Sequence, residues 1–158
     1  MRHTRIYLML CAIALVTVFA ASCKSSGMAV TSRGQFLKIN VNHPADLPEG
    51  AEDNVDVVLS NRGVNNISDI LVDVSLPPQL AVLDQTADRG INAMHDPGSN
   101  VYHFTIGKIQ PAEDAHLRFK VRTAFGGARE TGSIDITAWQ HDLPGDKLVE
   151  HAAIKMRG

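Results

Sequence analysis

The stretch Ala115-His116-Leu117-Arg118-Phe119-Lys120-Val121-Arg122-Thr123 alternates between apolar and polar side chains. This alternation has the period of a β-strand with one face buried and the other face in water. The large apolar side chains of the stretch are therefore expected to face a core, and the basic side chains between them are expected to face solvent.

The same pattern recurs along most of the chain, with turn-forming residues between the repeats. The further predicted strands cover 36–41, 54–60, 69–76, 80–83, 100–106, 133–140 and 148–156. A short helical turn is expected around Ile91–Met94, and a tight turn over Leu143–Asp146. No segment supplies the crossover helices that a parallel sheet needs. The sequence therefore predicts an all-β fold, an antiparallel Ig-like β-sandwich of seven to eight strands.

Length and composition limit the possible classes. The chain has 158 residues, of which 44% are hydrophobic and 20% charged, as expected for one globular domain. Aromatic residues make only 5%, which disfavours a carbohydrate platform of stacked rings. The net charge is −2, and removal of Arg2 and Arg5 with a leader leaves 13 basic against 17 acidic residues, or −4. A nucleic-acid-binding protein would instead show a basic excess.

The N-terminus has the pattern of a lipoprotein signal peptide over residues 1–22. Met1–Arg5 is basic, and Ile6–Ala21 is an uncharged run, too short for an ordinary membrane span. Small residues then precede Cys23, as lipoprotein processing requires. An ordinary secretory leader or an uncleaved anchor are the alternatives. Lys24 follows the cysteine, and under the enterobacterial sorting convention this predicts the outer membrane, facing the periplasm or the cell surface.

The predicted mature chain has two parts. Residues 23–34 are expected to form the lipidated cysteine and a flexible tether, because Ser25, Ser26 and Gly27 follow it closely. Residues 35–158 are expected to form the sandwich domain. Cys11 lies in the leader, so a processed chain would keep only Cys23, and the domain would contain neither disulfides nor thiolate metal sites.

Three stretches, Val57–Gly63, Ile70–Leu83 and Phe104–Val121, resemble a known bacterial module. The first ends in Asn-Arg-Gly, the second contains Leu-Pro-Pro-Gln-Leu, and the third is an aromatic strand followed by a Pro-Ala-Glu turn and another strand. They are similar to the bacterial conserved-repeat domain of unknown function, an Ig-like module of large surface proteins and of some cysteine-rich outer-membrane proteins. Ser75 and Ala112 depart from the family, which usually has Asp and Gly there. The resemblance implies an Ig-like fold and a surface role, and it implies no catalytic residue.

Two features are candidates for partner binding. Arg118, Lys120 and Arg122 form a basic stripe on one strand face, which could meet an anionic partner such as lipopolysaccharide or a polyacid. The alternative is a solvated face paired with acids on adjacent strands. Trp139, the single tryptophan, alternates outward from its strand and could be a contact hot spot. Cover by the 84–100 loop, or burial, is the alternative for this residue.

Metal binding has weaker support. His103 and His116 are expected on outward faces of strands that could be neighbours, where two imidazoles could bind zinc, although solvated histidines are more common. Calcium could use carboxylates of the irregular stretch 84–100, although their spacing fits no regular calcium loop (Asp84, Asp88 and Asp96). We therefore expect no metal site and no cofactor.

The sequence contains no serine-nucleophile elbow and no phosphate-binding loop, so we expect no enzyme. The predicted function is a non-enzymatic, lipid-anchored cell-envelope protein whose sandwich serves as a structural or protein-interaction module. The alternative is a ligand-binding module for polysaccharide or a metal ion. A polar pocket would favour this alternative, and an apolar patch or open sheet edge would favour protein binding.

Overall fold

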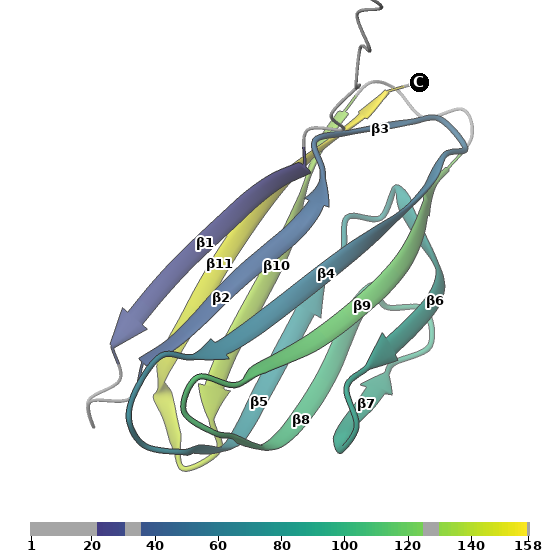
Figure 1. Ribbon diagram of the computed structural model, residues 1–158. Coiled ribbons are helices and arrows are strands. Elements are labelled where there is room, and N and C mark those ends of the chain that lie inside the picture. Colours follow the sequence, from purple (N-terminus) through teal and green to yellow (C-terminus); the bar gives the residue numbers. More distant parts are fainter. Residues whose placement is uncertain (1–21, 31–35, 125–129, 158) are drawn as a thin grey trace, which may run out of the picture.

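The computed structural model describes residues 22–30, 36–124 and 130–157, which form two sheets packed face to face (Figure 1). The strand order in the first sheet is β1 (Ser22–Val30), β2 (Phe36–Pro44), β4 (Glu52–Asn61), β9 (Asp114–Thr123) and β6 (Leu80–Ala87). The order in the second sheet is β3 (Asp46–Pro48), β11 (Leu143–Arg157), β10 (Glu130–Gln140), β5 (Ile67–Ser75), β8 (Val101–Ile109) and β7 (Ile91–His95).

The predicted all-β sandwich is confirmed, but the described residues form eleven strands and not seven to eight. All pairs are antiparallel except β3 with β11, which run parallel over three residues. The helical turn expected at Ile91–Met94 is wrong, because this segment is strand β7 and pairs with β8. The turn expected over Leu143–Asp146 is also displaced, since β11 begins at Leu143.

Strand β1 replaces most of the expected tether. Ser22–Val30 runs antiparallel to β2, with Cys23 opposite His43 and Val30 opposite Phe36. Without β1, the backbone N–H and C=O groups along one edge of β2 would have no partner. Segments of many different compositions can pair with such an edge, because the backbone makes the hydrogen bonds. Composition alone therefore did not reveal the pairing. The leader up to residue 21 and the tether residues 31–34 lie outside the described residues.

The core lies between the two sheets and follows the predicted alternation. Leu117, Phe119 and Val121 are fully buried, and the inward residues predicted on β10 are buried too. The Phe119 ring packs edge-on against Tyr102 and Phe104, with ring centroids 5.2 and 5.9 Å apart. No helix in the described part of the chain has the length and apolar character needed to cross a membrane.

Val58 differs from the expected pattern. The alternation on β4 predicted an outward, solvent-facing side chain, yet only 7% of Val58 is exposed. β4 is an inner strand of its sheet, and Val58 lies between Asn40 of β2 and His116 of β9. Neighbouring side chains can thus bury an outward position on an inner strand.

Asn61 fastens the turn after β4 to the end of β8. Its side chain is fully buried, and Nδ2 donates to the carbonyl oxygens of Asn65 at 2.8 Å and Ile109 at 2.9 Å. Its Oδ1 accepts the Gly63 N–H at 2.9 Å. The Asn-x-Gly sequence at 61–63 is therefore a hydrogen-bonded corner that holds strands of both sheets.

Gly132 of β10 is expected to tolerate no side chain. A Cβ atom at this position would lie 2.6 Å from Cβ of Pro77 and 2.9 Å from Cε of Met156. The proline ring cannot rotate away, so Gly132→Ala should lower the free energy of unfolding by about 1–3 kcal/mol through overpacking. Urea denaturation would measure the loss. Gly145→Ala is the control, because a Cβ there meets nothing within 4 Å. Equal stability of the two variants would contradict the prediction.

Candidate functional site

The basic stripe lies on the outer face of β9 and is paired with acids. Arg118 Nη1 lies 3.0 Å from Asp88 Oδ1, and Lys120 Nζ lies 2.8 Å from Glu52 Oε2. Arg122 Nη1 is 3.9 Å from the other carboxylate oxygen of Glu52. The hydrogen bond and the charge of Lys120 lower the pKa of Glu52 against an opposing effect of burial, and the charge of Arg122 adds a smaller lowering effect.

These contacts correspond to the alternative that the sequence left open, a solvated face paired with acids on adjacent strands. Arg118 is also 4.0 Å from Asp56 of β4, so carboxylates lie on either side of it. Exposed pairs of this kind each contribute about 0–1 kcal/mol to stability. The stripe is thus largely charge-balanced, and its binding to an anionic partner stays a prediction.

Trp139 lies on the outer face of the other sheet. It is half-buried beside Leu71 of β5, and Lys147 Nζ lies 4.8 Å from the centroid of its ring. This is the geometry of a cation–π contact. Because β9 and β10 belong to different sheets, Trp139 and the basic stripe face opposite sides of the sandwich. They cannot form one binding surface.

The two histidines considered for zinc are also separated. His103 lies on β8 of the second sheet and His116 on β9 of the first, so their strands are not neighbours. His103 Nδ1 is 2.7 Å from Asp73 Oδ1, and His116 Nδ1 is 3.1 Å from Asp56 Oδ2. The expectation that their strands could be neighbours is wrong. Within the ranges that the structure describes, no group of three or more potential metal ligands occurs.

The three aspartates considered for calcium have separate contacts. Asp84 accepts the N–H of Gln85 at 2.9 Å on β6. Asp88 accepts the backbone N–H of His116 at 2.9 Å, and Asp96 lies 3.8 Å from His103 on the other sheet. The structure therefore does not bring these carboxylates together.

Ser133, Asp135 and His151 meet on the outer face of the second sheet. Both the serine Oγ and the histidine Nδ1 contact the same oxygen of Asp135, the latter at 2.7 Å. In a hydrolytic triad the histidine lies between serine and aspartate and takes the serine proton. Here the aspartate occupies the middle, so this arrangement does not activate Ser133 as a nucleophile.

The carboxylates on both faces should make stability depend on pH. Burial raises the pKa of Asp88, but the His116 N–H bond and Arg118 outweigh it and hold the pKa below 3.8. The pKa of Asp135 is also lowered, because bonds from His151 and Ser133 outweigh burial. A carboxyl whose pKa is lowered on folding stabilises the fold above its unfolded pKa, and this contribution is lost as pH falls through the folded value.

We therefore expect a free energy of unfolding that changes little above about pH 5 and falls steadily below about pH 4. Urea midpoints measured between neutral and acidic pH would show the decline. Asp88→Asn should make the decline shallower, because this variant has no proton to bind at residue 88. An identical acid profile for the variant and the wild type would refute the role of Asp88.

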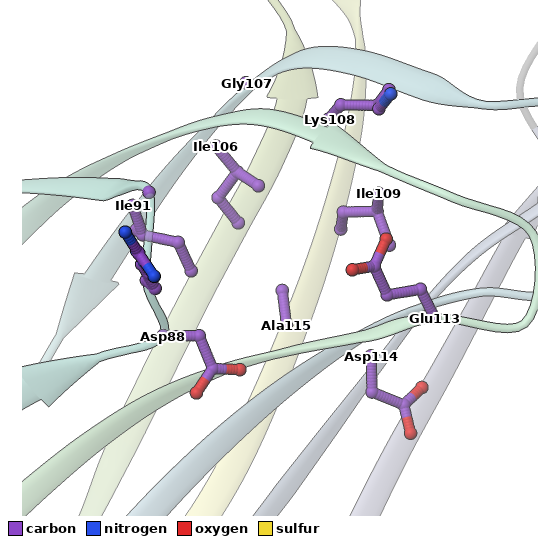
Figure 2. Close-up of a pocket in the computed structure, with 11 residues that line it drawn as sticks. Asp88, Ile91, Ile106, Gly107, Lys108, Ile109, Glu113, Asp114 and Ala115 are labelled. Atoms are coloured by element: carbon purple, nitrogen blue, oxygen red, sulfur yellow. The ribbon is translucent and has the colours of Figure 1, made fainter.

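A small cavity, here called the edge notch, opens between the sheets where β6 passes into β7 (Figure 2). Its volume is about 240 Å³. The apolar part of its lining is formed by Ile91, Ile106, Ile109 and Ala115. Two glycines, Gly90 and Gly107, also line the notch, and charged residues complete the lining, namely Asp88, Arg89, Lys108, Glu113 and Asp114. The sequence does not indicate this site, because its residues come from three separate segments that only the fold brings together.

The carboxylates of the edge notch differ in their partners. Asp88 pairs with Arg118 at 3.0 Å and Asp114 with Arg62 at 3.3 Å. Glu113 Oε2 instead accepts the backbone N–H of Gln110 at 2.7 Å. Arg89 and Lys108 of the lining, like Glu113, have no ion pair among the described residues.

No family model matches the chain, and no curated protein sequence matches it. Solved structures share its fold at low sequence identity. The RrgA Jo.In complex is 11% identical over 85% of this chain and 86% of that chain, with a TM-score of 0.56. AvmM, which catalyses macrocyclization in alchivemycin A biosynthesis, is 12% identical over 88% and 90%, with a TM-score of 0.51. Membership in the conserved-repeat family stays a prediction, and the chain is similar to these proteins in its fold alone.

Proposed function

We propose that this protein is a non-enzymatic module of a bacterial cell envelope, anchored by lipid at Cys23, that binds another protein. The observation that carries protein binding is the edge notch, an opening at a sheet edge whose floor between the sheets is apolar and whose other lining residues are mostly charged. Its volume of about 240 Å³ lies below the range of about 300–1,000 Å³ typical of small-molecule sites. A single side chain of a protein partner fits such a space better than a polysaccharide.

The proposed anchor and compartment rest on the leader. The uncharged run Ile6–Ala21 and the small residues before Cys23 support lipoprotein processing. Lys24 after the cysteine supports the outer membrane as the destination. Acylation of one cysteine by two chains is enough for stable membrane attachment.

Labelling with palmitate tests the anchor. Cys23→Ser should abolish incorporation of labelled palmitate and release soluble or unprocessed protein from the membrane fraction. Ser25→Ala, two residues further along the same strand, is the matched control and should leave both labelling and fractionation unchanged. A wild-type chain that takes up no palmitate would overturn the proposed lipid anchor.

Crosslinking in intact cells tests the protein-binding part. A photoreactive residue in place of Asp88, on the lining of the edge notch, should give one defined adduct with an envelope protein. The same residue in place of Asn54, which is exposed on β4 of the first sheet, should not give this adduct. Adducts absent from both positions would contradict protein binding through this edge.

A further inference from the structure

We propose that the edge notch binds an extended segment of a partner protein, which adds to the open edge of β8 and inserts one aliphatic side chain between the sheets. This inference rests on the proposed protein-binding function and names its site and the chemistry of the partner. Main-chain pairing would supply much of the affinity, and the inserted side chain would supply specificity.

In both sheets, the pairing with the outermost strand ends beside the notch. The pairing of β7 with β8 ends at Ile91 opposite Ile106, while β8 continues to Ile109. The pairing of β6 with β9 ends at Ala87 opposite Leu117, three residues after β9 begins. Strands β6 and β7 lie along the same side of the sandwich (Figure 1). Asp88 still bonds both the N–H and the C=O of His116, so the open edge beside the notch consists of residues 107–109 of β8 and residues 114–115 of β9.

Gly107 marks the open edge of β8. In the register of the ladder with β5 it lies opposite Asp69, but these two residues do not pair, whereas Ser68 pairs with Lys108 and Ile70 with Ile106. The ladder with β7 does not extend to it either. A Cβ atom at Gly107 would meet nothing within 4 Å, so no neighbouring side chain covers the face of the strand at this residue.

The lining of the notch defines the inserted side chain. Ile106, Ile109 and Ala115 are at most 7% exposed, and they form an apolar floor continuous with the core. An aliphatic side chain placed on this floor would be nearly desolvated, which is the environment of interface hot spots. The volume of about 240 Å³ admits one such side chain.

Charge complementarity defines the partner residue next to the inserted side chain. Figure 2 shows the Glu113 carboxylate next to Ile109, on the lining of the notch. Among the ion pairs of the described residues, Asp88 and Asp114 have arginine partners, whereas Glu113 and the two cations of the lining, Arg89 and Lys108, have none. A lysine or arginine next to the aliphatic residue of the partner would complete this carboxylate.

The experiment uses the full-length protein, solubilised in mild detergent, and a fluorescent peptide of sequence Thr-Lys-Thr-Ile-Thr-Lys-Thr. In an extended chain the isoleucine and both lysines share one face. Fluorescence anisotropy should show saturable binding below about 1 mM. Two comparison peptides, one with aspartate in place of isoleucine and one with glutamate in place of both lysines, should each bind at least about tenfold more weakly.

Two variants locate the peptide on the protein. Gly107→Pro removes the N–H of a residue that neither ladder pairs, and it should weaken binding at least about tenfold. Gly145→Pro, at another exposed strand glycine with nothing within 4 Å, is the control for proline and should bind normally. Glu113→Gln keeps an acceptor for the Gln110 N–H and removes the charge, so it should weaken only the lysine-containing peptides. Circular dichroism of each variant checks the fold.

The outcomes separate the two proposals. No saturable binding, or binding that is equal in Gly107→Pro and Gly145→Pro, would overturn the notch as the docking site. If the crosslinked envelope adduct described above still forms with Gly107→Pro, the protein-binding function stands and the inferred strand addition is wrong.

Discussion

Phe119→Ala is expected to lower the free energy of unfolding by about 3–5 kcal/mol. Phe119 is fully buried, and its ring contacts the rings of Tyr102 and Phe104, which come from the opposite sheet. Its removal would leave a cavity between the sheets at the place where three aromatic rings meet. The loss is a large share of the total stability of an ordinary domain, about 5–15 kcal/mol.

Urea denaturation followed by fluorescence or circular dichroism would measure this loss. Thr105→Ala, at an exposed position beside Phe104 on β8, is the control and should stay within about 0.5 kcal/mol of the wild type. A loss below about 1 kcal/mol for Phe119→Ala would mean that the core does not depend on this aromatic contact.

Asn61→Ala is expected to cost about 2–3 kcal/mol, although it removes no large apolar group. The substitution leaves the buried carbonyl oxygen of Ile109 and that of Asn65 without the amide donor, and the Gly63 N–H loses its acceptor. A buried polar group without a partner costs about 1–3 kcal/mol, which is more than the net gain from one ordinary hydrogen bond.

Asn65→Ala is the matched control for this prediction. It keeps the backbone carbonyl that Asn61 binds, and its own side chain is exposed, so its effect should be within about 0.5 kcal/mol. Amide hydrogen exchange of residues 61–67 should accelerate in Asn61→Ala and not in Asn65→Ala. Equal exchange rates in the two variants would show that the Asn61 side chain does not hold the corner.

The alternation of apolar residues was enough to predict the sandwich and the orientation of most core residues. Leu117, Phe119 and Val121 are buried as expected, because a one-residue shift would move every side chain to the other face. The short strand β7 was not predictable in this way. It lies among residues with weak local preference and becomes a strand because β8 offers a pairing partner.

The candidate site was less predictable from the sequence than the fold. Arg118, Lys120 and Arg122 were placed correctly on an outward face, but the sequence could not show which strand would pair with β9. β4 brings Glu52 and Asp56 beside them, and the stripe becomes charge-balanced. The edge notch depends on where two ladders end, which is a property of strand pairing and has no signature in any single segment.

The direction of β1 gives the molecule two distinct poles. Cys23 lies at the beginning of β1, whereas register through β2 and β4 places the beginning of β9, and with it the edge notch, near Met28 at the other end. Five residues of strand separate these levels by about 17 Å. With lipid on Cys23 and β1 paired, the sandwich would stand on the bilayer without slack, and the notch would open at its far pole. A partner would then have to approach from the aqueous side or the opposing layer, because a segment lying flat on the same leaflet could not reach it.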